Sequence, residues 1–169
     1  YKTTWFNFLL PPELRCYFYT KTNSDRLNKD DLFSLTEFAL ICFEELDGMR
    51  PAELNQLKAM VTMPYVNERA AYGRNKERHP HIASFCGTGN NVQFLTDPTG
   101  NRRWLPFEVS QIRDPHLHAI PYELVYSQAY ALWKSGFCHW FSQEEIRKLN
   151  MHNSRFEVPN LEEDLIRTH

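Results

Sequence analysis

The sequence predicts an α/β fold in which a mostly parallel sheet is followed by a helical C-terminal extension. Two short apolar runs, Phe38–Phe43 and Ile82–Cys86, have the continuous hydrophobicity of strands buried on both faces. Helical patterns separate the predicted strands, as in a parallel sheet covered by helices. From Tyr122 onward the pattern is mainly helical. We therefore expect the sheet core in residues 1–112 and a helical lid or extension in residues 113–169.

The first elements are short. The residues up to Leu10 predict a helix, because two prolines follow at once and disfavour its continuation. The aromatic segment Cys16–Thr20 predicts a short buried strand. Asp30 or Asp31 is expected to cap a short helix that runs through Leu35.

The middle of the chain combines a helix with a polar connection. Pro51 is expected to begin a helix that has Leu54, Leu57 and Val61 on one face. The polar and basic segment Met63–Pro80 has no apolar period, and we expect a loop or a hairpin there.

The last third is expected to hold one more strand. The turn Asp97–Gly100 precedes the predicted strand Trp104–Val109, which Pro106 places at an edge of the sheet. The apolar spacing of Tyr122–Trp133 predicts a helix that stops at Gly136.

Two more helices are expected near the C-terminus. Ser142–Glu145 has the capping-box pattern and opens a helix through about Asn150. A short acidic helix, Leu161–Ile166, is expected after Pro159. Three aromatic residues are expected in the core of this helical part: Trp133, Trp140 and Phe141.

Composition limits the possible functions. A length of 169 residues fits one domain with an appendage, which can bury a core without a disulfide or a metal. The formal net charge of −2 excludes a uniformly basic nucleic-acid coat but allows a local basic site. The longest apolar stretch is far shorter than the roughly 20 residues that span a bilayer. The four cysteines form no C-x-x-C pair, so we expect reduced thiols and a cytoplasmic protein with no membrane partner.

Polar residues follow both buried strands. Glu44 and Glu45 come directly after the first, at the edge where α/β sheets bind ligands. One carboxylate there can hold a hydrated Mg²⁺ while its neighbour activates water, although a charged pair also commonly ends a strand. Thr88, Asn90 and Asn91 follow the second strand. An Asn at this place can position water against a phosphate, and Gly-Asn turn chemistry is the structural alternative.

Two basic features agree with a phosphate-binding site. Arg102 and Arg103 follow a tight turn, and paired guanidinium groups suit phosphate recognition, although a solvated pair is equally compatible with the pattern. Lys2-Thr3, followed by a helix, matches the last two residues of the phosphate-binding loop G-x-x-x-x-G-K-[ST]. Taken in order with the acidic and polar strand ends, these residues form the layout of a P-loop ATPase.

The sequence resembles the virulence-associated protein E family, P-loop ATPases allied to superfamily-three helicases. The resemblance runs through nearly the whole chain and is strongest from Phe38 to Val109. The segments that carry it are Glu45-Leu46-Asp47-Gly48-Met49, Leu57-Lys58-Ala59, Glu68-Arg69-Ala70-Ala71-Tyr72-Gly73-Arg74, Gly87-Thr88-Gly89-Asn90 and Asp97-Pro98-Thr99-Gly100-Asn101-Arg102-Arg103-Trp104.

The resemblance implies a P-loop NTPase sheet of the AAA+ or helicase kind, with ATP and Mg²⁺ as cofactors. Lys2 would contact the phosphates, and Thr3 would ligate Mg²⁺ together with Glu44. Glu45 would polarise the attacking water.

The same resemblance implies a sensor and a residue that acts between subunits. Asn90 would position the attacking water, and Arg102 or Arg103 would be an arginine finger for the neighbouring subunit's nucleotide. A homo-oligomeric ring, DNA as a partner and a primase domain in the full protein are expected on the same ground.

Two positions depart from the family pattern. Glu44 stands where the Mg²⁺-binding residue is usually Asp. Tyr1 stands where many P-loops have their last glycine, so we expect the chain to begin inside this motif and to bind ATP poorly without the glycines.

The segment between the two buried strands is rich in cations. Four of them are candidates for contact with DNA phosphates in a ring's pore: Arg69, Arg74, Lys76 and Arg78. A solvated basic loop is the alternative.

The predicted function is ATP hydrolysis coupled to work on DNA in a mobile element or phage. A catalytically degenerate ATPase fold that serves as a DNA-binding or assembly module is the main alternative. A Mg²⁺-dependent nuclease that uses Glu44 and Glu45 is a third possibility, but it leaves Lys2-Thr3 without a role.

Overall fold

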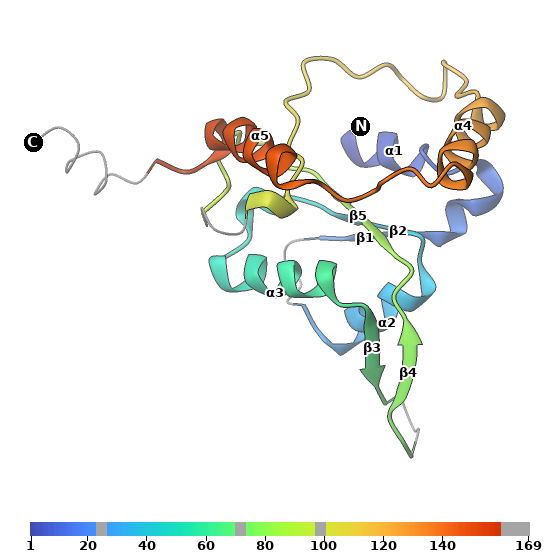
Figure 1. Cartoon of the computed structure of the whole chain (residues 1–169), viewed down its shortest axis with the longest axis vertical. Helices are drawn as coiled ribbons and strands as arrows, with labels where there is room; N and C mark the ends of the chain where they lie inside the picture. The colour runs from blue at the N-terminus through green and yellow to red at the C-terminus, as the bar shows by residue number, and fades with distance from the viewer. Residues whose placement is uncertain (23–26, 70–73, 97–100, 160–169) are drawn as a thin grey trace, which may run out of the picture.

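The computed structural model describes residues 1–22, 27–69, 74–96 and 101–159. Its centre is a three-stranded parallel sheet in the order β1-β2-β5 (Figure 1). The strands are β1 (Phe18–Lys21), β2 (Leu40–Phe43) and β5 (Ser84–Gly87). The predicted α/β class with a parallel sheet is therefore confirmed, and the two apolar strands are neighbours in it.

The middle strand, β2, lies between β1 and β5, and all four of its residues are buried. A parallel strand that is covered on both faces has no polar side, which explains the unbroken run Leu40-Ile41-Cys42-Phe43. Cys42 pairs in register with Cys86 of β5. A hydrogen bond to Cys42, together with burial, raises the pKa of the Cys86 thiol. Both thiols are free, as expected from the sequence.

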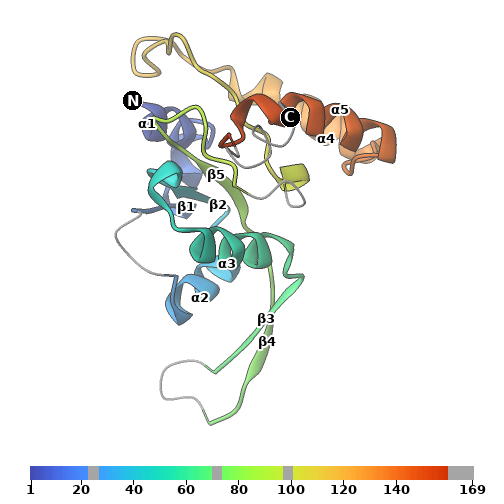
Figure 2. The same ribbon diagram turned by 90° about the vertical axis from the view of Figure 1, so that its left-hand side faces the viewer.

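Helices lie on both sides of the sheet (Figures 1 and 2). On one side are α2 (Lys29–Glu37) and α3 (Pro51–Thr62). On the other side are α1 (Lys2–Asn7) and the C-terminal helices α4 (Tyr122–Lys134) and α5 (Gln143–Asn153). No helix among the described residues is long and apolar enough to cross a membrane.

The main core forms where α2 and α3 cover the sheet. Leu54, Leu57 and Met60 of α3 recur every three residues and pack in one cluster with Ile41 and Phe43 of β2. A fully buried side chain of this size stabilises the fold by about 1.5–3 kcal/mol. Pro51 occupies the first turn of α3, where a missing N–H costs little, as the sequence predicts.

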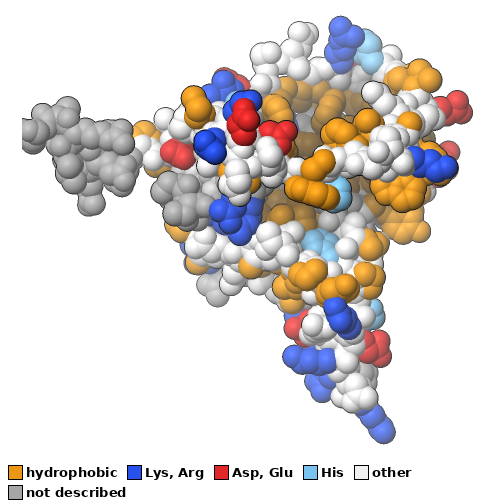
Figure 3. Space-filling model, in the orientation of Figure 1, with side chains coloured by type: hydrophobic (Ala, Val, Ile, Leu, Met, Phe, Trp, Pro, Cys, Tyr) orange, Lys and Arg blue, Asp and Glu red, His pale blue; other side chains and the backbone are white. Residues whose placement is uncertain are grey.

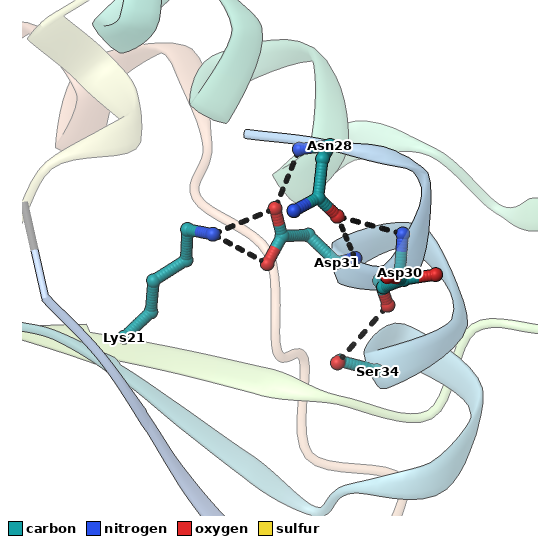
Figure 4. A network of polar contacts seen from close by, with 5 residues as sticks. All are labelled: Lys21, Asn28, Asp30, Asp31 and Ser34. Atoms are coloured by element: carbon teal, nitrogen blue, oxygen red, sulfur yellow. Dashed lines mark hydrogen bonds and ion pairs between the residues drawn. The ribbon is translucent and has the colours of Figure 1, made fainter. Parts of the chain in front are cut away.

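The start of α2 corrects one prediction, because the cap is Asn28 and not Asp30 or Asp31 (Figure 4). The Asn28 side chain accepts from the backbone N–H groups of both aspartates, at 2.8 and 3.2 Å. Asp31 is the third residue of the helix and accepts from the Asn28 backbone at 2.6 Å, which completes a capping box. Its carboxylate also receives two bonds of 2.8 Å from the ammonium of Lys21, at the end of β1.

The segment between α3 and β5 is a hairpin rather than a loop. Its strands, β3 (Tyr65–Glu68) and β4 (Glu77–Pro80), pair antiparallel and project away from the sheet (Figure 1). At the end of β3, Glu68 forms an ion pair with Lys29 of α2 at 3.2 Å, and this contact lowers the pKa of Glu68.

The predicted strand Trp104–Val109 is wrong. A 3₁₀ turn, η3 (Asn101–Arg103), is followed by an extended segment that pairs with no strand among the described residues. Its carbonyls face side chains instead: Asn153 donates to Trp104 O at 3.1 Å, and His152 Nε2 lies 2.9 Å from Pro106 O. Of its apolar side chains, Trp104 packs against the core, whereas Leu105, Phe107 and Val109 are exposed.

Helix α4 lies where predicted and α5 begins as predicted but runs on to Asn153; the aromatic residues of this part, however, do not form a core. Gly136 ends α4 with a φ of 73°, and Ser142 and Glu145 form the expected capping box before α5. Trp133 and Trp140, however, are 72% and 68% exposed, so their assignment to a core is wrong. Phe141 is exposed as well, and apolar side chains gather on this part of the surface in Figure 3. The predicted turn 97–100 and helix 161–166 lie outside the described residues.

Candidate active site

The first residues of α1 lie at the carboxyl edge of the sheet. The Thr3 hydroxyl donates to a carboxylate oxygen of Glu44 at 2.6 Å. The Lys2 ammonium donates to the backbone carbonyl of Gly89 and, at 3.2 Å, to the side-chain oxygen of Asn90. Residues 41 and 88 positions apart in the chain thus meet at one place.

The two acids after β2 have different environments. The backbone N–H of Glu44 donates to Lys21 O at 2.8 Å, which extends the β1–β2 pairing and holds the half-buried Glu44 at the sheet edge. Glu45 is exposed, with φ 54° and ψ 45°, and is the only described residue other than glycine with a positive φ. That conformation costs about 1–2 kcal/mol, and such strain is typical of functional sites.

The turn at Glu45 connects the ends of β2 and β5. After it, the chain enters the 3₁₀ turn η2 (Leu46–Gly48), and the N–H of Leu46 donates to Thr88 O at 2.9 Å. Thr88 N–H in turn donates to Phe43 O, also at 2.9 Å. Backbone hydrogen bonds therefore join the acidic end of β2 to the polar end of β5.

Glycine is required where this edge is most crowded. A Cβ added at Gly87 would overlap the side chain of Leu46. A Cβ added at Gly89 would lie 2.9 Å from a carboxylate oxygen of Asp47. These close approaches explain the two glycines of the Gly87-Thr88-Gly89-Asn90 segment by packing, not only by turn chemistry.

Asp47 is a site residue to which the sequence analysis assigns no role. One carboxylate oxygen accepts from the backbone N–H of Asn91 at 2.9 Å, so Asp47 holds the loop that carries Asn90. The other oxygen is buried with no hydrogen-bond partner among the described residues. Its place two residues after Glu45, in a segment that contains the strand-end acids, is the signal that points to it.

Arg102 and Arg103 do not join the cluster of Lys2, Thr3, Glu44 and Asn90 at the sheet edge. Both are exposed on η3, and neither makes a hydrogen bond or an ion pair with another described residue. Within the described part of the chain, the side-chain hydrogen bonds of Lys2 and Glu44 go to Gly89, Asn90 and Thr3, and not to either arginine. The structure therefore presents the arginine pair on the surface, outside the cluster at the sheet edge.

The basic residues between the two strands also lie apart from the sheet edge. Arg74, Lys76 and Arg78 are exposed on the hairpin, as is Arg69, and Figure 3 shows blue side chains along its length. The Arg78 guanidinium lies over the ring of Tyr65, with 3.6 Å between its carbon and the ring centroid.

The oxygens at the sheet edge fit a hard divalent cation. Magnesium binds through one or two protein oxygens and substrate phosphates, and the Thr3 hydroxyl and Glu44 carboxylate oxygen are already adjacent. Within the described residues, no group of three or more His, Cys, Asp or Glu side chains has the arrangement of a metal site. Cation binding here would therefore depend on bound phosphates as further ligands.

Comparison with known proteins gives one family. The model of the virulence-associated protein E-like domain matches residues 1–158. No curated protein matches the chain in sequence.

Proposed function

The chain belongs to the virulence-associated protein E-like family, and we propose that it provides the catalytic edge of a P-loop ATPase. The observation that carries the proposal is the hydrogen bond between Thr3 and Glu44. A hydroxyl after a lysine and a strand-end carboxylate, 41 residues apart, are the pair that this class of ATPase uses around its cation.

Lys2, Thr3 and Glu44 would bind the triphosphate end of ATP. The Lys2 ammonium donates to oxygens of Gly89 and Asn90, and phosphate oxygens of a bound nucleotide would replace these acceptors. When bound, Mg²⁺ neutralises charge on the phosphate oxygens. The Thr3 hydroxyl and the Glu44 carboxylate are the residues that would hold it.

Glu45 and Asn90 would act on the attacking water. Glu45 is exposed at the carboxyl edge, beside the residue that contacts Thr3. Its carboxylate can orient a water and accept its proton, and the Asn90 amide can fix the same water. Arg102 or Arg103 would complete the site of a neighbouring copy, since both are exposed and lie outside the cluster of their own chain.

We infer that the work is done on DNA, in a mobile element or phage. The support is the family and the hairpin, whose four Arg and Lys side chains exceed its two Glu side chains in charge.

The decisive experiment measures ATP turnover by the full protein with Glu45→Gln. Loss of a general base lowers the rate by about 10²–10⁴-fold, while binding of a fluorescent ATP analogue should persist because Lys2 and Thr3 are unchanged. The control is Glu37→Gln, which alters an exposed carboxylate at the end of α2. Equal turnover in Glu45→Gln and wild type would contradict the assignment.

A catalytically degenerate DNA-binding or assembly module is the second candidate. It is favoured by Glu44, which is one methylene longer than the usual Asp, and by the exposed basic hairpin. Calorimetry on the full protein separates the two. DNA binding without any nucleotide binding would support the module and exclude the ATPase.

A further inference from the structure

Asn153, the last residue of α5, is completely buried beneath η3, the turn that carries Arg102 and Arg103. Its side-chain nitrogen donates to Asn101 O at 2.7 Å and to Trp104 O at 3.1 Å. These carbonyls stand immediately before and after Arg102 and Arg103. A single buried amide therefore fastens both ends of the turn that exposes the arginine pair.

A second contact fixes the same turn from the following segment. The side chain of Asn101, itself 1% exposed, donates to Glu157 at 2.6 Å. Glu157 comes directly after η4 (Ser154–Phe156), which continues from α5. The turn is thus fixed by the C-terminal helical segment through two contacts, one from each end of η4.

The chemistry of the Asn153 amide makes the contact specific. A primary amide has two N–H donors, and here both are used on backbone carbonyls, one of which, Asn101 O, also accepts from the Trp104 N–H at 3.0 Å. An aspartate has nearly the same shape but only acceptor oxygens when ionised, so it would face the two carbonyls with no hydrogen to share.

We propose that Asn153 is a positioning residue that fixes the orientation of Arg102 and Arg103. The activity of the proposed arginine finger then depends on helix α5. The inference rests on the proposed ATPase function, because the arginines need a nucleotide on which to act. It assigns Asn153 no contact with the nucleotide itself. Displacement of a catalytic group by about 1 Å lowers a rate by about 10²-fold, which sets the size of the expected effect.

The test compares Asn153→Asp with Asn150→Asp, a matched change at an exposed position one turn earlier on α5. ATP turnover is measured with the full protein. We expect Asn153→Asp to lower kcat by roughly 10–100-fold with less than about twofold change in KM, and Asn150→Asp to behave as wild type. The variant Asn153→Gln keeps both donors on a longer stem and should recover part of the turnover.

A double-variant measurement separates positioning from a merely structural role. In the background Arg102→Ala/Arg103→Ala, Asn153→Asp should lower kcat no further, because the groups it positions are gone. If both changes act independently and their effects multiply, the inference is wrong. If Asn153→Asp does not fold, Glu157→Ala, which removes only the second contact, should show the same loss and the same non-additivity.

The outcomes for the two proposals are distinct. A wild-type protein without ATP turnover would contradict the proposed function, and the inference with it. Normal turnover that falls on Arg102→Ala/Arg103→Ala but not on Asn153→Asp would overturn the inference alone.

Discussion

At the scale of single residues, the site depends on close approach between the ends of β2 and β5. Gly87 and Gly89 leave room for Leu46 and Asp47. The sequence points to the candidate residues Glu44, Glu45 and Asn90, because they are polar groups shortly after apolar strands. It does not predict the supporting contacts, because the bond from Asn91 N–H to Asp47 joins residues 44 positions apart.

Asp47 should therefore affect catalysis through the loop that carries Asn90. Asp47→Ala removes the acceptor for the Asn91 N–H, and we expect ATP turnover to fall about tenfold, equivalent to about 1.4 kcal/mol. Asp47→Asn keeps an acceptor oxygen and should retain most of the activity. Steady-state ATPase assays of both variants measure the difference. Equal loss in Ala and Asn variants would show that charge, not the hydrogen bond, is what matters.

At the scale of elements, the sequence predicts a strand or helix correctly where the burial of its own side chains determines it. The prediction fails where the structure depends on which other element lies beside the segment. The strand β2 is predictable because four apolar residues in a row fit a position covered on both faces. The segment Trp104–Val109 has a strand-like composition, but no strand in the described part of the chain pairs with it, and side chains of α5 contact two of its carbonyls instead. In the same way, the apolar face of α4 predicts a helix without specifying what covers Trp133, which is exposed.

The junction of β1 and α2 provides a prediction of stability. Lys21 and Asp31 are each 4% exposed and paired at 2.8 Å, and removing one partner of a buried pair costs about 3–5 kcal/mol. Lys21→Met should lower the free energy of unfolding by that amount. The control is Lys29→Met, which breaks the more exposed pair with Glu68 and should have a much smaller effect, because solvent screens that pair. Urea denaturation compares the two, and a similar cost for both would contradict the assigned role of the buried pair.

At the scale of the whole molecule, charge is distributed unevenly. The net charge of the chain is −2, yet the hairpin that projects from the sheet is basic, and its Arg and Lys side chains are exposed to solvent (Figure 3). Composition alone averages these regions, so it excludes a basic coat but cannot locate the basic surface. The location follows from the pairing of β3 with β4, which places the cations on an arm beyond the sheet.

The hairpin should therefore dominate the salt dependence of DNA binding. The triple variant Arg74→Ala/Lys76→Ala/Arg78→Ala should weaken binding to a fluorescent oligonucleotide. Each lost phosphate contact should reduce the slope of log K against log salt concentration by about 0.7 for a single strand or 0.9 for a duplex. Anisotropy titrations between about 50 and 200 mM salt measure both quantities.

The matched control removes three exposed cations elsewhere, as Lys134→Ala/Arg147→Ala/Lys148→Ala on α4 and α5. Both triple variants change the net charge equally, so a general electrostatic attraction would weaken binding to the same extent in each. A hairpin that contacts phosphates instead requires a larger loss of affinity and of slope in the first variant, at unchanged melting temperature. Equal losses would place the DNA contact elsewhere and leave the hairpin as a solvated arm.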